Sequence, residues 1–158
     1  MIAIYRPGFK ALVSVAGKEA AAMAGLSSLD LDELRDFPRY WERLFEDGDQ
    51  RQIAAHYTPD AQLVATGLPT VVGRNAIENF WRLAIERTAA AGLRRSVRLD
   101  HVEKSGSLGY MRGFVEVCGP GVSTATRYVT VWRREPDGLW RLAVDISCNQ
   151  PEAVTATQ

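Results

Sequence analysis

The chain has 158 residues, 46% of them hydrophobic and 24% charged, which is typical of one globular domain and excludes a disordered chain. Its 19 basic residues balance 19 acidic ones, so no basic field exists to attract a phosphate backbone, and we expect no nucleic-acid partner. No apolar run approaches the ~20 residues that cross a bilayer, so we expect no membrane partner.

Residues 1–28 are rich in Ala and Gly and have weak periodicity, so we expect an N-terminal extension that is flexible or docks as a short helix. Charged residues interrupt its apolar stretch, which argues against a secretory signal. Residues 29–151 are expected to form a single domain, followed by a tail at residues 152–158. Cys118 and Cys148 lie outside any Cys-x-x-Cys pattern, which favours half-buried thiols in a reducing, cytoplasmic compartment.

The first helical pattern lies between Leu29 and Asp47. Pro38 fits only the first turn of a helix, so we expect the main helix to start near Asp36. The apolar residues recur at steps of three and four and define one face: Leu34, Phe37, Trp41, Leu44 and Phe45.

A short second helix is expected after Gly48-Asp49, with Ile53, Ala54 and Tyr57 on its apolar edge. Residues 58–60 predict a turn, residues 61–65 a short strand, and residues 71–72 a short extended piece. A third helix should run from Gly73 to Gly92, because apolar residues again follow helical spacing: Ile77, Phe80, Trp81, Ala84, Ile85 and Thr88.

After Leu93 the pattern becomes that of strands, at residues 97–103, 108–117, 124–134 and 139–147, separated by Gly- and Pro-containing turns. Helices followed by an antiparallel meander define the α+β class. We therefore expect a curved antiparallel sheet packed on three N-terminal helices, forming a cone with an internal pocket.

Short sequence words accompany these elements: residues 45–49, His56-Tyr57, residues 59–61, residues 73–77, residues 131–134 and residues 137–141. In this order they resemble the SnoaL-like branch of the nuclear-transport-factor-2-like superfamily, over most of the chain. The resemblance implies the cone fold. The superfamily includes isomerases, cyclases, dehydratases, epoxide hydrolases and non-catalytic oligomerisation domains, so the fold alone does not select a function.

Comparison with ketosteroid isomerases places their tyrosine on Trp41, their catalytic base on Ala65 and their second acid near Tyr128. Alanine abstracts no proton, so this comparison disfavours the steroid mechanism. The Asp-Arg-Asp arrangement of the epoxide hydrolases is not apparent. The last strands are also similar to the association domain of calcium/calmodulin-dependent kinase II. Arg112 matches one of its pocket arginines, whereas Thr130 and Ser147 stand at two others, which weakens the expectation of a carboxylate pocket.

Strand alternation, oriented by these matched positions, predicts the faces that line the pocket. Arg112 and Asp145 would then pair inside an aromatic-walled cavity, either facing a ligand or fixing the sheet register. The basic cluster Arg94, Arg95 and Arg98 is interpreted as a solvated strand edge. The predicted inward residues are Tyr110, Arg112 and Phe114, then Tyr128, Thr130 and Trp132, then Ala143, Asp145 and Ser147, with His101 beside Val97 and Leu99.

The leading hypothesis is an isomerase, cyclase or dehydratase that moves a proton on a small apolar carbonyl or hydroxyl compound. Asp145 resembles, by placement, the aspartate proposed as acid/base in some polyketide cyclases. Arg112 would orient it, and Tyr128 or Tyr110 would polarise the substrate oxygen. The other expected substrate contacts are Trp41, Ala65, Phe114, Thr130, Trp132, Ser147 and His101.

We expect no metal and no other cofactor, because neither metal-ligand spacing nor a nucleotide-binding motif is present. The alternative hypothesis is a non-catalytic ligand-binding or oligomerisation domain. In either case a homodimer is expected, since Met111, Val115 and Val131 would form an apolar convex face that needs cover.

Overall fold

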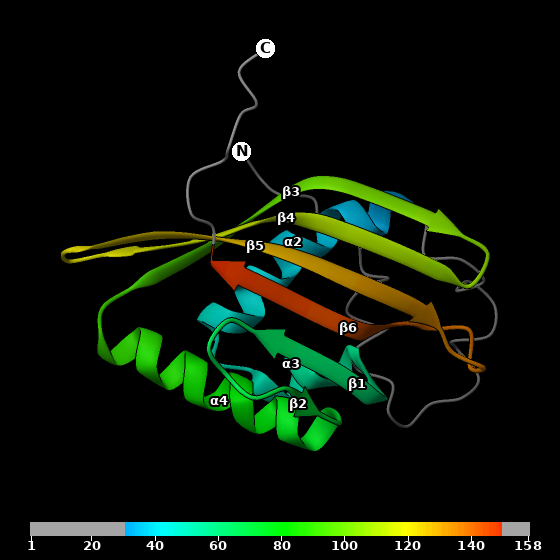
Figure 1. The fold of residues 1–158 in the computed structure, drawn as a ribbon, viewed down its shortest axis with the longest axis horizontal. Helices are drawn as coiled ribbons and strands as arrows, with labels where there is room; N and C mark the ends of the chain where they lie inside the picture. Colours follow the sequence, from blue (N-terminus) through cyan, green and yellow to red (C-terminus); the bar gives the residue numbers. More distant parts are fainter. Residues whose placement is uncertain (1–30, 150–158) are drawn as a thin grey trace, which may run out of the picture.

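The structure is a computed structural model that describes residues 31–149. The expected extension at residues 1–28 and the tail at residues 152–158 lie outside this range. No helix in residues 31–149 is long and apolar enough to cross a membrane. Figure 1 shows the elements in order: α2 (Leu31–Glu46), α3 (Gln50–Ala55), β1 (Tyr57–Ala65), β2 (Val71–Val72), α4 (Arg74–Ala90), β3 (Arg94–Ser105), β4 (Leu108–Gly119), β5 (Val122–Arg134) and β6 (Trp140–Asn149).

Helix α2 buries the predicted apolar face against the sheet. It starts at Leu31 and continues through Pro38, so the expected start near Asp36 is wrong. A proline inside a helix costs about 3 kcal/mol, because it removes one hydrogen bond and crowds the preceding turn. Phe37 and Trp41 are 6% and 5% exposed, and the burial of this face offsets that cost.

Helix α3 ends at Ala55, two residues before the end of its expected apolar edge at Tyr57. Asp49 caps α3 by accepting a hydrogen bond from the Gln52 N–H at 3.0 Å, and Ile53 is fully buried. Tyr57 is wrongly predicted on this helix, because it begins β1. The Leu142 N–H donates to the His56 carbonyl at 2.7 Å, which pulls this segment onto the sheet and replaces the turn expected at residues 58–60.

Helix α4 confirms the third predicted helix. It follows Gly73, whose φ of 88° suits a residue without a Cβ atom, and Ile77 and Trp81 are buried. Figure 1 shows α4 (green) alongside β1 and β2, while α2 (cyan) crosses behind the long strands.

The six strands of the described region form one sheet in the order β2-β1-β6-β5-β4-β3. Strands β3 to β6 form the expected antiparallel meander, but β1 pairs with β6 in parallel. Register irregularities occur between Leu99 and His101, between Val131 and Trp132, and between Tyr57 and Gln62. The three helices and this curved, unclosed sheet confirm the predicted α+β cone.

Gly113 in β4 lies opposite Tyr128 in β5, and the tyrosine ring packs across it. A Cβ atom at Gly113 would lie 1.9 Å from the Arg98 carbonyl oxygen and 2.9 Å from the Tyr128 hydroxyl oxygen. Both distances are shorter than any non-bonded contact allows. The residue must therefore stay a glycine if β3, β4 and the Tyr128 ring are to keep their positions.

We predict that Gly113→Ala destabilises the protein by ~3 kcal/mol or more, because backbone on one side and a buried ring on the other must both move. Chemical denaturation monitored by tryptophan fluorescence would measure this loss. Gly109→Ala is the matched control in the same strand, because its nearest contact would be 3.3 Å and needs only a small adjustment. Equal stability of the two variants would contradict the packing described for Tyr128.

Candidate functional site

A cavity of about 240 Å³ lies between helices α2 and α4 and the inner face of the sheet. Its volume is slightly below the range of about 300–1,000 Å³ that is common for ligand sites, which favours a small ligand. Most of its wall is apolar. The lining residues are Phe37, Pro38, Trp41, Phe45, Leu63, Phe80, Trp81, Ala84, Thr88, Arg95, Val97, Met111, Val115, Val117, Thr126, Tyr128, Thr130, Leu142, Asp145 and Ser147.

Asp145 from β6 is the carboxylate that lines this cavity. The Tyr57 hydroxyl donates a hydrogen bond to its Oδ2 at 2.6 Å, and the Trp81 indole N–H donates to the Tyr57 hydroxyl at 3.0 Å. The Arg74 guanidinium holds the backbone of Tyr57 by donating to its carbonyl oxygen at 2.6 and 2.9 Å. Residues from α4, β1 and β6 thus fix one carboxylate oxygen.

Burial raises the pKa of Asp145 above its ordinary value of 3.8, because the charged form loses its hydration. The hydrogen bond from Tyr57 and the positive charge of Arg95 act in the opposite direction, but burial dominates. Burial, with the neighbouring Asp145 adding to it, also raises the pKa of Tyr57, so this hydroxyl remains a donor. The carboxyl group is therefore poised to hold a proton at higher pH than an exposed aspartate.

Arg95 from β3 brings a positive charge into the same cavity. Its guanidinium lies over the rings of Phe45 and Trp81, with its carbon 5.2 and 5.5 Å from their centroids. Burial lowers its pKa, with Asp145 opposing the shift, but an arginine stays protonated. Its Nη1 atom is shielded from solvent and has no hydrogen-bond partner.

Tyr128 from β5 supplies a second unpaired polar group. Its hydroxyl oxygen is buried without a hydrogen-bond partner, and burial raises its pKa, so it remains a neutral donor. Thr130, the next inward residue on β5, accepts a hydrogen bond from the Trp132 indole N–H at 3.1 Å. In the sheet Thr130 lies opposite Asp145, and Tyr128 lies opposite Ser147.

The structure brings five of the expected site residues to the cavity wall: Trp41, Tyr128, Thr130, Asp145 and Ser147. Two others are in or against the hydrophobic core and do not line the cavity. Trp132 is 1% exposed and packs edge-on against Phe37 at 4.5 Å between centroids. Ala65 packs against the core beside the cavity.

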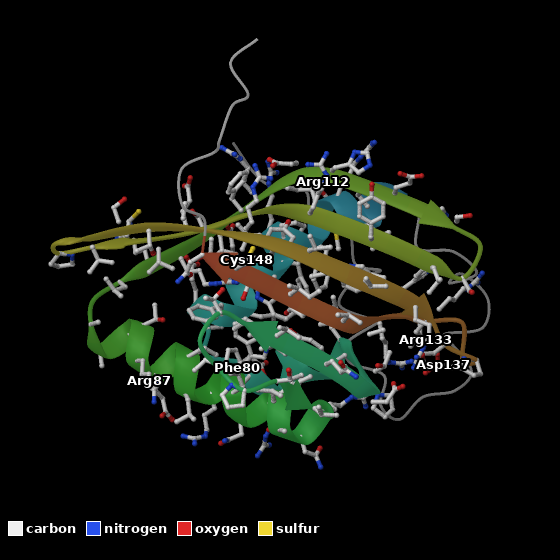
Figure 2. All side chains as sticks on the ribbon, in the orientation of Figure 1. Phe80, Arg87, Arg112, Arg133, Asp137 and Cys148 are labelled. Carbon is white, nitrogen blue, oxygen red and sulfur yellow. The ribbon has the colours of Figure 1, made fainter. Side chains whose placement is uncertain are left out.

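The expected orientation of β4 is wrong. Met111 lies opposite Thr130 and faces the cavity, so its neighbours Tyr110 and Arg112 point to the outer face. Arg112 is exposed, and the ion pair that was expected between Arg112 and Asp145 is not among those formed within residues 31–149. In Figure 2 Arg112 lies at the top of the view, away from Phe80, which lines the cavity. Phe114 also faces outward.

These outward residues have partners of their own. The Phe114 ring lies between the guanidinium groups of Arg98 and Arg127, at 4.7 and 4.3 Å. The rings of His101 and Tyr110 lie 5.5 Å apart, and His101 does not line the cavity. The irregularity after Leu99 disrupts the alternation that was expected to turn this histidine inward.

Met111 and Val115 line the cavity, so they do not contribute to the convex face on which a dimer was expected; Val131 stays outside the lining. Both cysteines are exposed free thiols, which corrects the expectation of half-buried ones. Within the described part of the chain, no group of three His, Cys, Asp or Glu residues could hold a metal ion.

Tyr57 and Arg95 are the site residues that sequence reasoning missed. Arg95 shares its parity with Val97 and Leu99, which were expected to face inward, so alternation did contain the signal. Its charge led to the interpretation as a solvated edge. Tyr57 had no comparable signal, because it precedes the irregular part of β1.

A concave, mostly apolar cavity with a few convergent polar groups is the kind of site in which proteins bind small molecules. The family model of the SnoaL-like domain matches residues 37–143, so the chain belongs to the SnoaL-like family. No curated protein matches the sequence significantly.

Solved structures confirm the likeness in fold. A nuclear-transport-factor-2-like protein with a cystatin-like fold from Novosphingobium aromaticivorans is 21% identical, covering 78% of this chain and 84% of that chain, with a TM-score of 0.69. A candidate calcium/calmodulin-dependent protein kinase II association domain from Xanthomonas campestris is 16% identical (80% and 92% coverage, TM-score 0.64). A ketosteroid isomerase-like protein from Erwinia carotovora is 17% identical (75% and 95%, TM-score 0.59).

We predict that Asp145→Asn is more stable than the wild type near neutral pH, by a few degrees in melting temperature. A raised native pKa means that the native state binds the Asp145 proton more tightly than the unfolded state does. The resulting gain in folding stability is complete below the pKa of Asp145 in the unfolded state. It is lost as the pH rises through the pKa of Asp145 in the native state. Asparagine avoids the loss and still accepts the Tyr57 hydrogen bond.

Thermal melts of both proteins from about pH 8 to about pH 4.5 would test this prediction, with the gap closing toward acid pH. Burial also lowers the pKa of His56 to about 3, so both proteins lose stability in acid for that reason. The difference between them isolates Asp145. A pH-independent gap would contradict the raised pKa.

Proposed function

We propose that this SnoaL-like protein is an isomerase, cyclase or dehydratase that acts by proton transfer on a small, largely apolar carbonyl or hydroxyl compound, without a cofactor. The observation that carries the proposal is the Asp145 carboxyl group in an apolar cavity, held at one oxygen by the buried Tyr57 hydroxyl. The other oxygen is then available to a ligand. A raised pKa makes the Asp145 carboxylate a stronger base than an exposed aspartate, which suits a group that abstracts a proton.

The proposed roles follow the positions of the side chains. Asp145 takes or gives the proton, and Tyr57 is a positioning residue that holds it in one orientation. The unpaired Tyr128 hydroxyl donates to the substrate oxygen where negative charge develops. Trp41 and Phe80 contact the apolar body of the substrate. Arg112 has no part in this mechanism, because it is exposed on the outer face.

A panel of enones, polyketide-like aromatics and terpenoid alcohols, followed by NMR in deuterated water, would test the proposal through product formation or deuterium exchange. We predict that Asp145→Asn lowers the rate on any compound turned over by about 100-fold or more, because the acid/base group is lost. Asp47→Asn, at an exposed position, is the matched control and should keep full activity. Full activity of Asp145→Asn would refute the proposed role.

Assembly is a second candidate function, favoured by the outer face of the sheet. Val129 and Ile146 lie opposite each other on β5 and β6, and each is 39% exposed. Arg112 lies opposite Val129 on the other side and gives this face a polar border. We propose that a second copy of the chain covers the patch, since apolar sheet faces of this kind form two-fold interfaces.

We predict that the wild type sediments as a dimer at micromolar concentration and that Ile146→Lys shifts it to a monomer, because a charge would be buried in the interface. Val72→Lys is the control. Val72 is 59% exposed but lies on the edge strand β2, which is separated from β6 by β1. A monomeric wild type, or a dimer that survives Ile146→Lys, would exclude this interface.

A further inference from the structure

We propose that the ligand of this cavity is a small organic monocarboxylate whose anionic group binds the Arg95 guanidinium while its hydrocarbon part packs against the aromatic wall. The inference rests on the proposed use of the cavity as a ligand site but not on catalysis by Asp145. It names the substrate class of that site: a compound that carries a carboxylate in addition to the reacting oxygen.

Arg95 is a half-buried cation whose Nη1 atom is shielded from solvent, and no acidic residue within residues 31–149 forms an ion pair with it. None of the ion pairs or hydrogen bonds formed within residues 31–149 includes its guanidinium. The Phe45 and Trp81 rings provide cation–π contacts, which replace only part of the lost hydration. A buried charge is costly unless it is paired, and a ligand anion would supply the missing partner.

The charged and titratable groups that face Arg95 come from four elements: Glu42 on α2, Tyr57 on β1, Tyr128 on β5 and Asp145 on β6. The Glu42 carboxylate already accepts a hydrogen bond from the Val97 N–H, which fastens α2 to the edge strand β3. The two tyrosines are neutral donors. Asp145 is therefore the group whose ionisation decides whether the cavity carries a net positive charge.

The chemistry of the cavity favours a carboxylate among the possible anions. A guanidinium presents paired N–H donors that match the two oxygens of a carboxylate. A single arginine in a wall made mostly of aromatic and aliphatic side chains gives a doubly charged phosphate too few donors. A volume of about 240 Å³ suits one ring or a short branched chain attached to that carboxylate.

Binding should be coupled to the protonation of Asp145. An ionised Asp145 and a ligand carboxylate compete for the same positive charge, so the complex favours the protonated aspartate. Affinity for the carboxylate should then rise as the pH falls from about 8 to about 6, with uptake of a proton on binding. A protonated Asp145 in the complex is also the form that can donate to a substrate hydroxyl or carbonyl oxygen.

Isothermal titration calorimetry with benzoate, cyclohexanecarboxylate and their primary amides would test the inference. Each amide keeps the shape of its acid and removes the charge. We expect each carboxylate to bind at least about tenfold more tightly than its amide at about pH 6, and to bind more weakly at about pH 8. Titrations in two buffers of different ionisation enthalpy would report the proton taken up.

Variants assign the effect to Arg95. Arg95→Gln should remove the preference for carboxylate over amide, while Arg94→Gln, an exposed neighbour on the other face of β3, should keep it. Arg95→Met tests folding: losing a half-buried charge that has no ion-pair partner should leave the melting temperature at or above that of the wild type. Asp145→Asn should bind carboxylates with little dependence on pH.

Equal affinities for acids and amides, carboxylate binding that survives Arg95→Gln, or no binding of any carboxylate at millimolar concentration would each overturn the inference. These outcomes are separable from failure of the proposed function. Carboxylate binding as expected, together with turnover that is unaffected by Asp145→Asn, would refute only the catalytic role. Turnover of neutral enones that depends on Asp145, in a protein that binds no carboxylate, would refute only the anion site.

Discussion

The Tyr57 hydroxyl is the junction on which the rest of the site depends. It accepts from Trp81 on α4 and donates to Asp145 on β6, and it belongs to the first residue of β1. Because it lies in the core with no exposed surface, neither bond can be replaced by solvent. These two hydrogen bonds therefore join α4 to the sheet and set the orientation of the Asp145 carboxyl group.

This junction gives the cavity an unusual balance of charge. Tyr57 stabilises the ionised form of Asp145, Arg95 does so as well, and burial opposes both and prevails. Arg95 in turn remains charged between Phe45 and Trp81 with no carboxylate in contact. One cation and one carboxyl group whose pKa is raised by burial therefore meet in this cavity, and this combination supports the proposal of a ligand that brings an anion or receives a proton.

Much of the fold could be predicted from sequence because its signals are local. The helical stripe of α4, the turns between the long strands and the order of elements needed no knowledge of distant contacts. The orientation of β4 depended on a matched arginine, and here the match misled. Met111, Val115 and Val117 give that strand an apolar parity, which alone would have turned Arg112 outward. Likewise, alternation alone would have placed Arg95 inside with Val97, but its charge led to the wrong interpretation as part of a solvated edge.

The remaining differences between the predicted and the observed site arise where the alternation of inward and outward side chains along a strand is interrupted. An extra residue in one strand turns every later side chain to the other face, and no hydrophobic pattern shows it in advance. The irregularity after Leu99 separates His101 from the inward row, and the one between Val131 and Trp132 brings Leu142 to the cavity with Asp145 three residues later. Tyr57 precedes a third irregularity, in β1. Such positions are determined by pairing with strands far along the chain, so the residues that complete the site are those whose orientation required the structure.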